Sequence, residues 1–293
     1  MNVPVKTTKM TNKDHQAIHR KLLAIVEESN CRLTPGELKK RLLGKTYVDS
    51  KVLETAICDL VLNRELTYTY QFGCSFLEKS YEKPIRVSRR VVLKPPEMVY
   101  EPVSCDIVID ILKGASFGFG DHPTTRLALQ GIETVLSKKH VDINANDCCA
   151  LDIGTGSGIL VIAAALIGIK HAVGIDIDPC ARAEAQKNIQ LNGLEHRIKI
   201  LDTRVEDIKE TYFLITANLR YPTLKQLCPH IAGITQKKGA VVVSGIKSDE
   251  ADDLLDTFAQ NGFQCTWKAE EKGWAGMVLN HSGSKVQGSG FKV

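Results

Sequence analysis

The sequence predicts an α/β protein with a mostly parallel sheet, preceded by a small domain of helices and a hairpin. Beyond residue 96, short apolar runs recur with helical segments between them, which is the pattern of parallel strands joined by crossover helices. Before residue 96 the apolar spacing is helical and then alternates. A chain of 293 residues is long enough for both. We therefore expect domains at 1–95 and 96–280, with a flexible tail at 281–293.

The composition, 43% hydrophobic and 25% charged, is that of an ordinary globular protein. No run approaches the roughly 20 apolar residues that cross a bilayer, and the first residues lack the apolar core of a signal peptide. Nine cysteines lack the spacing of a zinc site, so we expect reduced thiols and no metal. These features predict a cytoplasmic protein without a membrane partner.

The first domain resembles a winged helix in the order of its predicted elements. Apolar periodicity predicts a helix over 14–28, and a capping box formed by Thr34 and Glu37 begins a second. Asp49 can cap a third helix. Alternating residues on both sides of a turn at 71–73 then predict a hairpin, the wing of such a domain.

Positive charge is concentrated in this first domain. Residues 1–95 carry 18 Lys and Arg against 10 Asp and Glu, whereas residues 96–293 carry 20 against 24. The excess follows the predicted wing, in Lys79, Lys83, Arg86, Arg89, Arg90 and Lys94. Three interpretations stay open: contact with nucleic acid, a module that docks protein, or a solvated basic face.

A proline-rich stretch at 95–102 predicts a stiff connection between the domains. The second domain then offers five strand-like runs, at Ala150–Ile153, Ala172–Ile175, Ile198–Leu201, Phe213–Ala217 and Val241–Ile246. The last two runs, Phe263–Lys268 and Gly276–Asn280, leave no room for a crossover helix between them. They predict an antiparallel hairpin at the edge of a seven-stranded sheet.

A glycine-rich segment, Leu151–Gly158, lies between the first of these strands and a helical pattern. Such a turn lets the backbone approach a ligand, but alone it also fits dinucleotides or a simple tight turn. Asp176 ends the next strand about twenty residues later, where a carboxylate can bind ribose hydroxyls. Asp178 is better explained as the cap of a helix that begins at Pro179.

The spacing of the glycines, G-x-G-x-G, differs from the G-x-G-x-x-G of pyrophosphate sites. The segment holds Asp152 and no Lys or Arg, which suits a ligand with a positive sulfur rather than a phosphate. A dehydrogenase is therefore disfavoured, and an adenosyl sulfonium is favoured.

The string Ala115–Thr125, followed by the glycine segment, the GIDIDP strand end and Asn218-Leu219, resembles the ribosomal protein methyltransferases of the PrmA type. The resemblance covers about residues 105–280. It implies a class I methyltransferase fold and S-adenosyl-L-methionine as cofactor. By position it implies that the cofactor is contacted at Thr125, at Gly154 and Gly156, at Asp176 and at Asn218.

This sequence departs from the family pattern near the reaction site, with Phe119 and Asp121 in the FGTG-like string and Arg220-Tyr221 after the asparagine-leucine pair. Asp121, His122, Arg220 and Tyr221 are therefore candidate substrate contacts, although His122 can instead brace the loop. The winged-helix-like domain also replaces the family's usual docking domain.

The resemblance implies methyl transfer to a protein amine, with a ribosomal protein as partner. Asn218 and the carbonyl of Leu219 are the candidate catalytic groups, because either can accept a hydrogen bond from the deprotonated acceptor amine and orient its remaining proton. Two alternatives remain: methylation of RNA or of a small acid, and a DNA-binding regulator that senses S-adenosyl-L-methionine without turnover.

Overall fold

The computed structural model describes residues 12–29, 31–44, 49–71, 73–80, 82–112, 114, 118, 120, 122–137 and 148–282. The chain divides into two compact units, Met1–Lys83 and Pro84–Val293. Within the described residues, no helix is both long and apolar enough to span a membrane.

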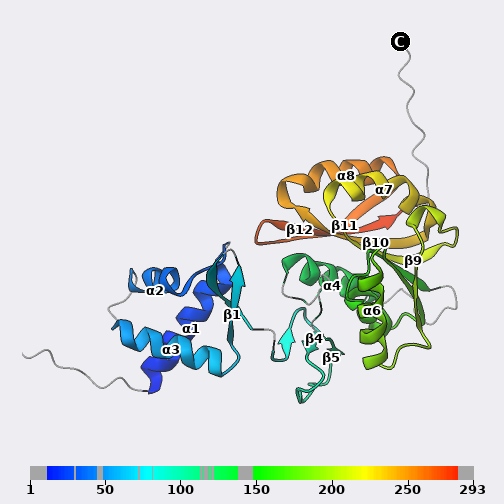
Figure 1. Cartoon of the computed structure of the whole chain (residues 1–293). Helices are drawn as coiled ribbons and strands as arrows, with labels where there is room; N and C mark the ends of the chain where they lie inside the picture. Colours follow the sequence, from blue (N-terminus) through cyan, green and yellow to red (C-terminus); the bar gives the residue numbers. More distant parts are fainter. Residues whose placement is uncertain are drawn as a thin grey trace, which may run out of the picture. The chain divides into compact units, whose positions relative to one another are not determined.

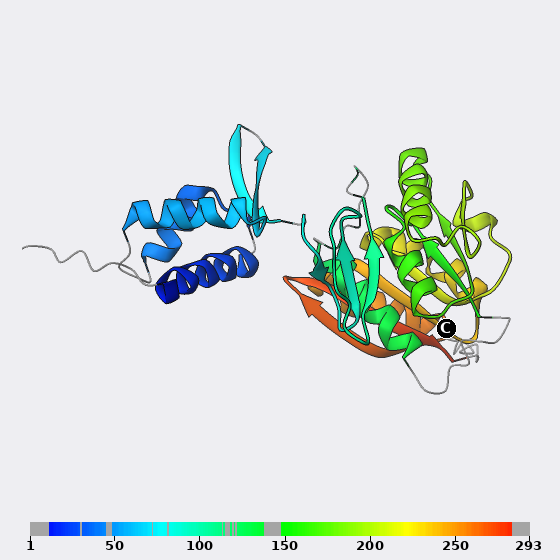
Figure 2. The ribbon, with the colours of Figure 1, turned by 90° about the horizontal axis from the view of Figure 1, so that it is seen from below.

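The N-terminal unit contains three helices and a hairpin, as the sequence predicted (Figure 2). The helices are α1 (Asn12–Glu28), α2 (Pro35–Leu43) and α3 (Ser50–Leu62), and the strands are β1 (Leu66–Gln71) and β2 (Cys74–Lys79). Thr34 and Glu37 form the predicted capping box, and Asp49 caps α3 by accepting a bond from the Lys51 N–H. Leu33, between α1 and α2, makes an isolated bridge to Leu77 of β2. A winged-helix role for this unit stays a prediction.

The basic residues near the hairpin are largely paired with carboxylates. The pairs are Lys79–Glu27 at 2.5 Å, Lys83–Glu65 at 2.6 Å, Arg86–Asp106 at 2.6 Å, and Lys94–Asp110. The prediction that the positive charge follows the wing is wrong for Arg86, Arg89, Arg90 and Lys94, which belong to the second unit. Paired cations have less charge available for phosphates.

The second unit begins earlier than the sequence predicted, because the stretch before the prolines belongs to it. The strands β3 (Ile85–Arg86), β4 (Val91–Lys94) and β5 (Ile107–Asp110) form a small sheet in which β4 and β5 are parallel. The carboxylate of Glu133, buried on α4 (Pro123–Leu136), accepts bonds from the Ser88 hydroxyl and the Arg90 N–H and thus ties the turn between β3 and β4 to this helix. The proline-rich segment lies inside the unit and is not a linker between the two units.

The main sheet has seven strands in the order β11-β12-β10-β9-β6-β7-β8. Their bounds are β6 Cys149–Ile153, β7 His171–Ile175, β8 Ile198–Leu201, β9 Tyr212–Asn218, β10 Thr235–Lys247, β11 Phe263–Glu271 and β12 Trp274–His281. All five predicted parallel strands and the antiparallel edge hairpin are confirmed. His281 ends β12 rather than starting the tail, and residues 283–293 lie outside the described residues.

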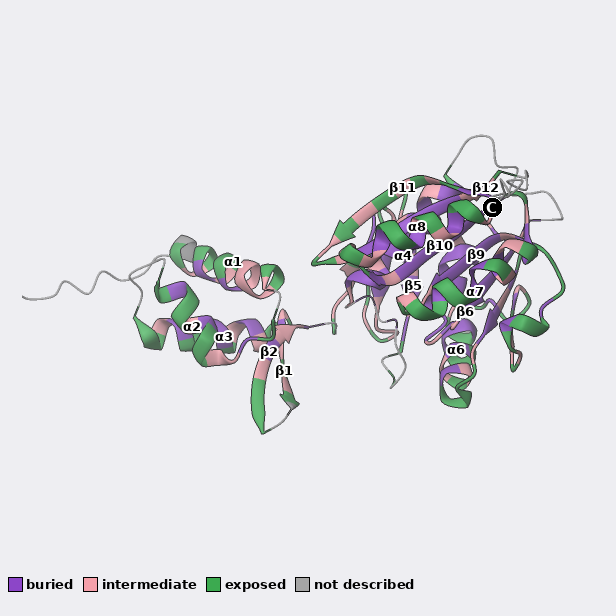
Figure 3. Ribbon diagram, turned by 90° about the horizontal axis from the view of Figure 1, so that it is seen from above, coloured by how far each residue is buried: buried purple, intermediate pink, exposed green. Residues whose placement is uncertain are grey.

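Helices cover both faces of this sheet, so its strands form two apolar cores (Figures 1 and 3). One face carries α4 (Pro123–Leu136), α5 (Ile159–Ile167) and α6 (Pro179–Leu191). The other carries α7 (Tyr221–Ile234) and α8 (Ala251–Gln260), and two short helices, η1 (Val205–Asp207) and η2 (Ser248–Glu250), complete the unit.

The strand order reverses at β6, which has β7 on one side and β9 on the other. In open α/β sheets, ligands bind beyond the carboxyl ends of the strands at such a reversal. The topology alone therefore places the expected site after β6, β7 and β9.

Candidate functional site

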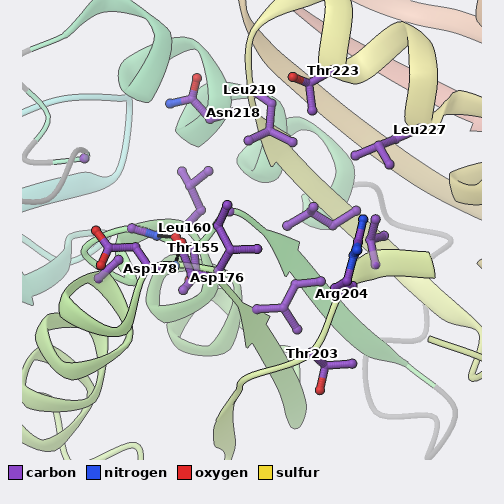
Figure 4. Close-up of a pocket in the computed structure, with 18 of the residues that line it drawn as sticks. Thr155, Leu160, Asp176, Asp178, Thr203, Arg204, Asn218, Leu219, Thr223 and Leu227 are labelled. Atoms are coloured by element: carbon purple, nitrogen blue, oxygen red, sulfur yellow. Dashed lines mark hydrogen bonds between the residues drawn. The ribbon is translucent and has the colours of Figure 1, made fainter. Parts of the chain in front are cut away.

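A pocket of about 620 Å³ lies at this reversal. Figure 4 shows Asn218 and Leu219 on one side of the opening and Thr155 and Asp176 on the other. The cavity is large enough for a nucleoside-sized ligand. The predicted residues Gly154, Gly156, Asp176, Asn218 and Leu219 all line it.

The glycine loop after β6 is folded tightly against the end of β7. Gly154 and Gly156 have φ angles of 70° and 55°, which only glycine adopts without strain. The N–H groups of Gly154 and Thr155 donate to the carbonyl of Ile175 at 2.9 and 3.0 Å, and the N–H of Gly156 donates to the Asp176 carboxylate at 2.9 Å. These three donors are therefore not available to a pyrophosphate.

Asp176 is oriented by the backbone on both sides. Its second oxygen accepts the N–H of Asp178 at 2.9 Å, so both oxygens are fixed at the edge of the pocket. Asp178 caps α6, as predicted, by accepting the Cys180 N–H at 2.8 Å. Between the two carboxylates, the side chain of Ile177 is 84% exposed although it is apolar, and it also lines the pocket.

Asp152 supports the glycine loop from beneath. Its buried carboxylate accepts bonds from the hydroxyls of Thr155 at 2.7 Å and Thr216 at 2.6 Å. Burial and, to a smaller extent, the nearby charge of Asp176 raise the pKa of Asp152 to about 6, against the opposing effect of these two bonds. The loop thus rests on a carboxylate that is costly to ionise.

The opposite wall of the pocket is formed where β9 ends against β10. The Leu219 N–H donates to the Ser244 carbonyl at 3.1 Å. Gly245 has a φ of 89°, and a Cβ atom there would lie 2.5 Å from the Leu219 carbonyl oxygen and 2.9 Å from Asn218 Oδ1. A Cβ at Gly154 would lie 2.7 Å from Leu219 Cδ2. Two glycines therefore hold the Asn218-Leu219 turn in position, one from each side.

The FGFG string reaches the pocket at Gly118, which lines it. The Ser157 hydroxyl donates to the Gly118 carbonyl at 2.8 Å, and the buried amide of Asn188 donates to the Ser157 carbonyl at the same distance. Asp121, which we predicted as a substrate contact, lies outside the described residues.

Four other predicted residues do not line the pocket: Thr125, His122, Arg220 and Tyr221. Thr125 is fully buried, and its hydroxyl has no hydrogen-bond partner among the described residues. His122 caps α4, with Nδ1 accepting the Thr124 N–H at 3.3 Å, so it braces the loop as the alternative reading expected. Their roles toward cofactor and substrate stay predictions.

Arg220 and Tyr221 follow the asparagine-leucine pair at the start of α7. The Tyr221 hydroxyl bonds to the carboxylate of Asp253 on α8, which directs it to a neighbouring helix. Arg220 is exposed, and its side chain makes no ion pair within the described part of the chain. Of the two, Arg220 is the one left accessible to a substrate.

Part of the lining was not predicted from the sequence. It comes from the loop after β8 and from α7: Thr203, Arg204, Val205, Glu206, Thr223, Gln226 and Leu227. The rule that ligands bind at strand ends could have found the first group, because the loop directly follows the predicted strand Ile198–Leu201. The apolar Ile177 beside Asp176 was a second available signal.

A sheet with this strand order, an antiparallel hairpin at its edge and its pocket at the central reversal is the class I methyltransferase fold. The chain belongs to the ribosomal protein L11 methyltransferase (PrmA) family, whose family model matches residues 76–282.

Two curated relatives and one crystal structure illustrate the similarity. The ribosomal protein L11 methyltransferase of Heliobacterium modesticaldum is 34% identical over 212 residues, covering 72% of this chain and 64% of the relative. That of Geotalea uraniireducens is 32% identical, covering 67% and 64%. A ribosomal protein L11 methylase from Lactobacillus delbrueckii subsp. bulgaricus is 31% identical with a TM-score of 0.61, covering 68% of this chain and 98% of that one. The chain thus spans less than two thirds of the length of these curated relatives.

Proposed function

We propose that this chain transfers a methyl group from S-adenosyl-L-methionine to an amine of another protein, and that this substrate is ribosomal protein L11. The observation that carries the cofactor assignment is the glycine loop. Three of its N–H groups bond within the protein, to Ile175 and to Asp176, so a pyrophosphate would find them occupied.

The charges of the lining agree with a cationic ligand. Among the described lining residues are the carboxylates of Asp176, Asp178 and Glu206, and the guanidinium of Arg204, whose Nε lies 3.6 Å from the Glu206 carboxylate. This excess of negative charge attracts a positive sulfur and repels a phosphate. The family membership supports the same cofactor.

The pocket offers a separate environment for each part of the cofactor. Asp176 can accept both ribose hydroxyls, because its oxygens keep lone pairs beyond the two backbone bonds. Ile177, Val205 and Leu227 offer apolar surface to the adenine ring. Asn218 and Leu219 form the wall to which the methyl group would be presented.

When bound, S-adenosyl-L-methionine supplies an electrophilic methyl carbon for an in-line displacement. The protein's task is to hold the acceptor nitrogen about 3 Å from that carbon and aligned with it. The amide oxygen of Asn218 or the Leu219 carbonyl accepts a hydrogen bond from the neutral amine and orients its lone pair. Arg220, exposed beside this turn, disfavours the protonated amine by charge repulsion.

The test is transfer of a radiolabelled methyl group to recombinant ribosomal protein L11, beside a cell lysate fractionated into protein, RNA and small molecules. We expect label in L11, and an Asn218→Ala variant about 100-fold slower in methyl transfer. Label confined to RNA or to small molecules would contradict the acceptor. No label in any fraction, with cofactor binding intact, would contradict the enzyme assignment.

A further inference from the structure

Next to the Asn218 wall, the indole ring of Trp274 is covered by an ammonium group of the same chain. The Nζ of Lys247 lies 3.6 Å from the ring centroid. Lys247 is exposed, and its ammonium makes no ion pair with a carboxylate within the described residues. The face of the ring is thus the main partner of this cation.

The ring is held rigidly from three directions. Trp274 pairs with Lys247 in the register of β12 and β10, and His122 contacts the ring edge-to-face at 4.8 Å between centroids. Glu271, opposite Trp274 across the hairpin turn, accepts the Arg126 Nε at 3.0 Å and fixes the hairpin to α4. A fixed aromatic face loses little entropy when it binds a ligand.

The residue paired with Trp274, Lys247, lies close along β10 to the wall where the methyl group would be transferred. Gly245 abuts Asn218, and Lys247 follows two residues later along β10, which is about 7 Å at the rise of a strand. That distance corresponds to about two residues of an extended chain. Trp274 is therefore placed to meet a neighbour of the acceptor residue rather than the acceptor itself.

We propose that the face of Trp274 is a subsite for a positively charged side chain of the protein substrate, about two residues from the methylated residue, and that Lys247 occupies this subsite in the free protein. That a cation of the protein substrate occupies this subsite rests on the proposed function. That the ring can bind a cation does not depend on it. An aromatic face attracts an alkylammonium by its quadrupole. Because the contact with Lys247 is exposed, a substrate cation can displace it.

The first test uses the small number of tryptophans. The chain has two, so a Trp267→Phe variant leaves Trp274 as the only indole fluorophore. In this background we expect Nα-acetyl-lysine amide to change the emission saturably, and a Lys247→Met substitution to tighten its binding by about 2- to 5-fold, the size of an exposed cation–π contact. The matched control is the same compound with a neutral, Nε-acetylated side chain, which should give no saturable change.

Three results would overturn the subsite: no saturable change after Lys247→Met, the same affinity with and without Lys247, or an equal response to the neutral compound. Calorimetry with S-adenosyl-L-methionine distinguishes a failure of the subsite from a failure of the proposed function. Neither Lys247 nor Trp274 lines the pocket, so Lys247→Met should leave the cofactor affinity unchanged.

The second test uses methylation of recombinant ribosomal protein L11. Trp274→Leu should raise KM by about 2- to 5-fold with kcat unchanged, and Lys247→Met should lower KM. An unchanged KM in Trp274→Leu would contradict the subsite. If L11 is not methylated at all, the proposed acceptor fails, and the fluorescence titration still decides on the subsite.

Discussion

The two units of the chain use their polar groups in opposite ways. In the N-terminal unit the charges lie on the surface and pair with each other, as in Lys79–Glu27 and Lys83–Glu65. In the second unit the polar groups that matter are few, buried or fixed by the backbone, such as Asp152 and Asp176. Abundant charge therefore marks a solvated face here, and sparse charge marks the site.

The largest expected difference between the units concerns glycine. Gly245→Ala places a Cβ against the Leu219 carbonyl at a φ of 89°, which should cost about 2 to 6 kcal/mol of unfolding free energy through strain and close contact. The displaced Asn218 turn should also slow methyl transfer by about 100-fold. Denaturant unfolding and the methylation assay measure the two effects.

The matched change in the N-terminal unit is Gly36→Ala, in the first turn of α2. No atom lies within 4 Å of its added Cβ, so we expect a gain of about 0.5 to 1 kcal/mol and no change in activity. If the two alanine variants had equal stability, the close packing assigned to Gly245 would be contradicted.

The next effect is the pH dependence of Asp152. Its pKa rises from 3.8 in the unfolded chain to about 6 in the folded protein, so the folded state binds more protons between these values. Its contribution to stability is therefore present below pH 4 and is lost as the pH rises through 6, by about 3 kcal/mol in all.

An Asp152→Asn variant should lack this component. We expect the unfolding free energy of the variant, relative to that of the parent, to rise steadily as the pH is raised from 4 to 7. A constant difference between the two proteins across this range would show that Asp152 titrates normally.

The smallest expected effect concerns the surface pairs of the N-terminal unit. Lys79→Gln should change the unfolding free energy by less than about 1 kcal/mol, because both partners are well exposed and screened by salt. The measurement is a denaturant melt at low and high salt. A cost of several kcal/mol that persisted in high salt would break the contrast between the units.

Most of the architecture could be predicted because it depends on local patterns. Continuous apolar runs gave the parallel strands, and caps such as Thr34, Asp49 and Asp178 gave the helix starts within a residue. The strands β3 to β5 were missed because they have only two to four residues each. The turn between β3 and β4 is also bonded to the buried Glu133 of α4, a contact that no local pattern contains.

The candidate site was predictable where one residue type is required by the backbone, as at Gly154 and at the strand end of Asp176. The direction in which each side chain points was harder to predict. Nothing in the order of residues indicates that the Tyr221 hydroxyl reaches Asp253, or that Lys94 meets Asp110, because these partners come from other elements. The count of charges in residues 1–95 was accurate, but its interpretation required knowledge of which charges form ion pairs.

The central claim is that the pocket after β6, β7 and β9 binds an adenosyl sulfonium through Asp176. Titration calorimetry of the full chain with S-adenosyl-L-methionine tests it most directly, with Asp256→Ala, an exposed carboxylate on α8, as the matched control. We expect binding by the parent and the control, and a loss of at least about tenfold in Asp176→Ala, the value of charged hydrogen bonds to ribose. Absence of binding by the parent, or equal affinity in Asp176→Ala, would contradict the account.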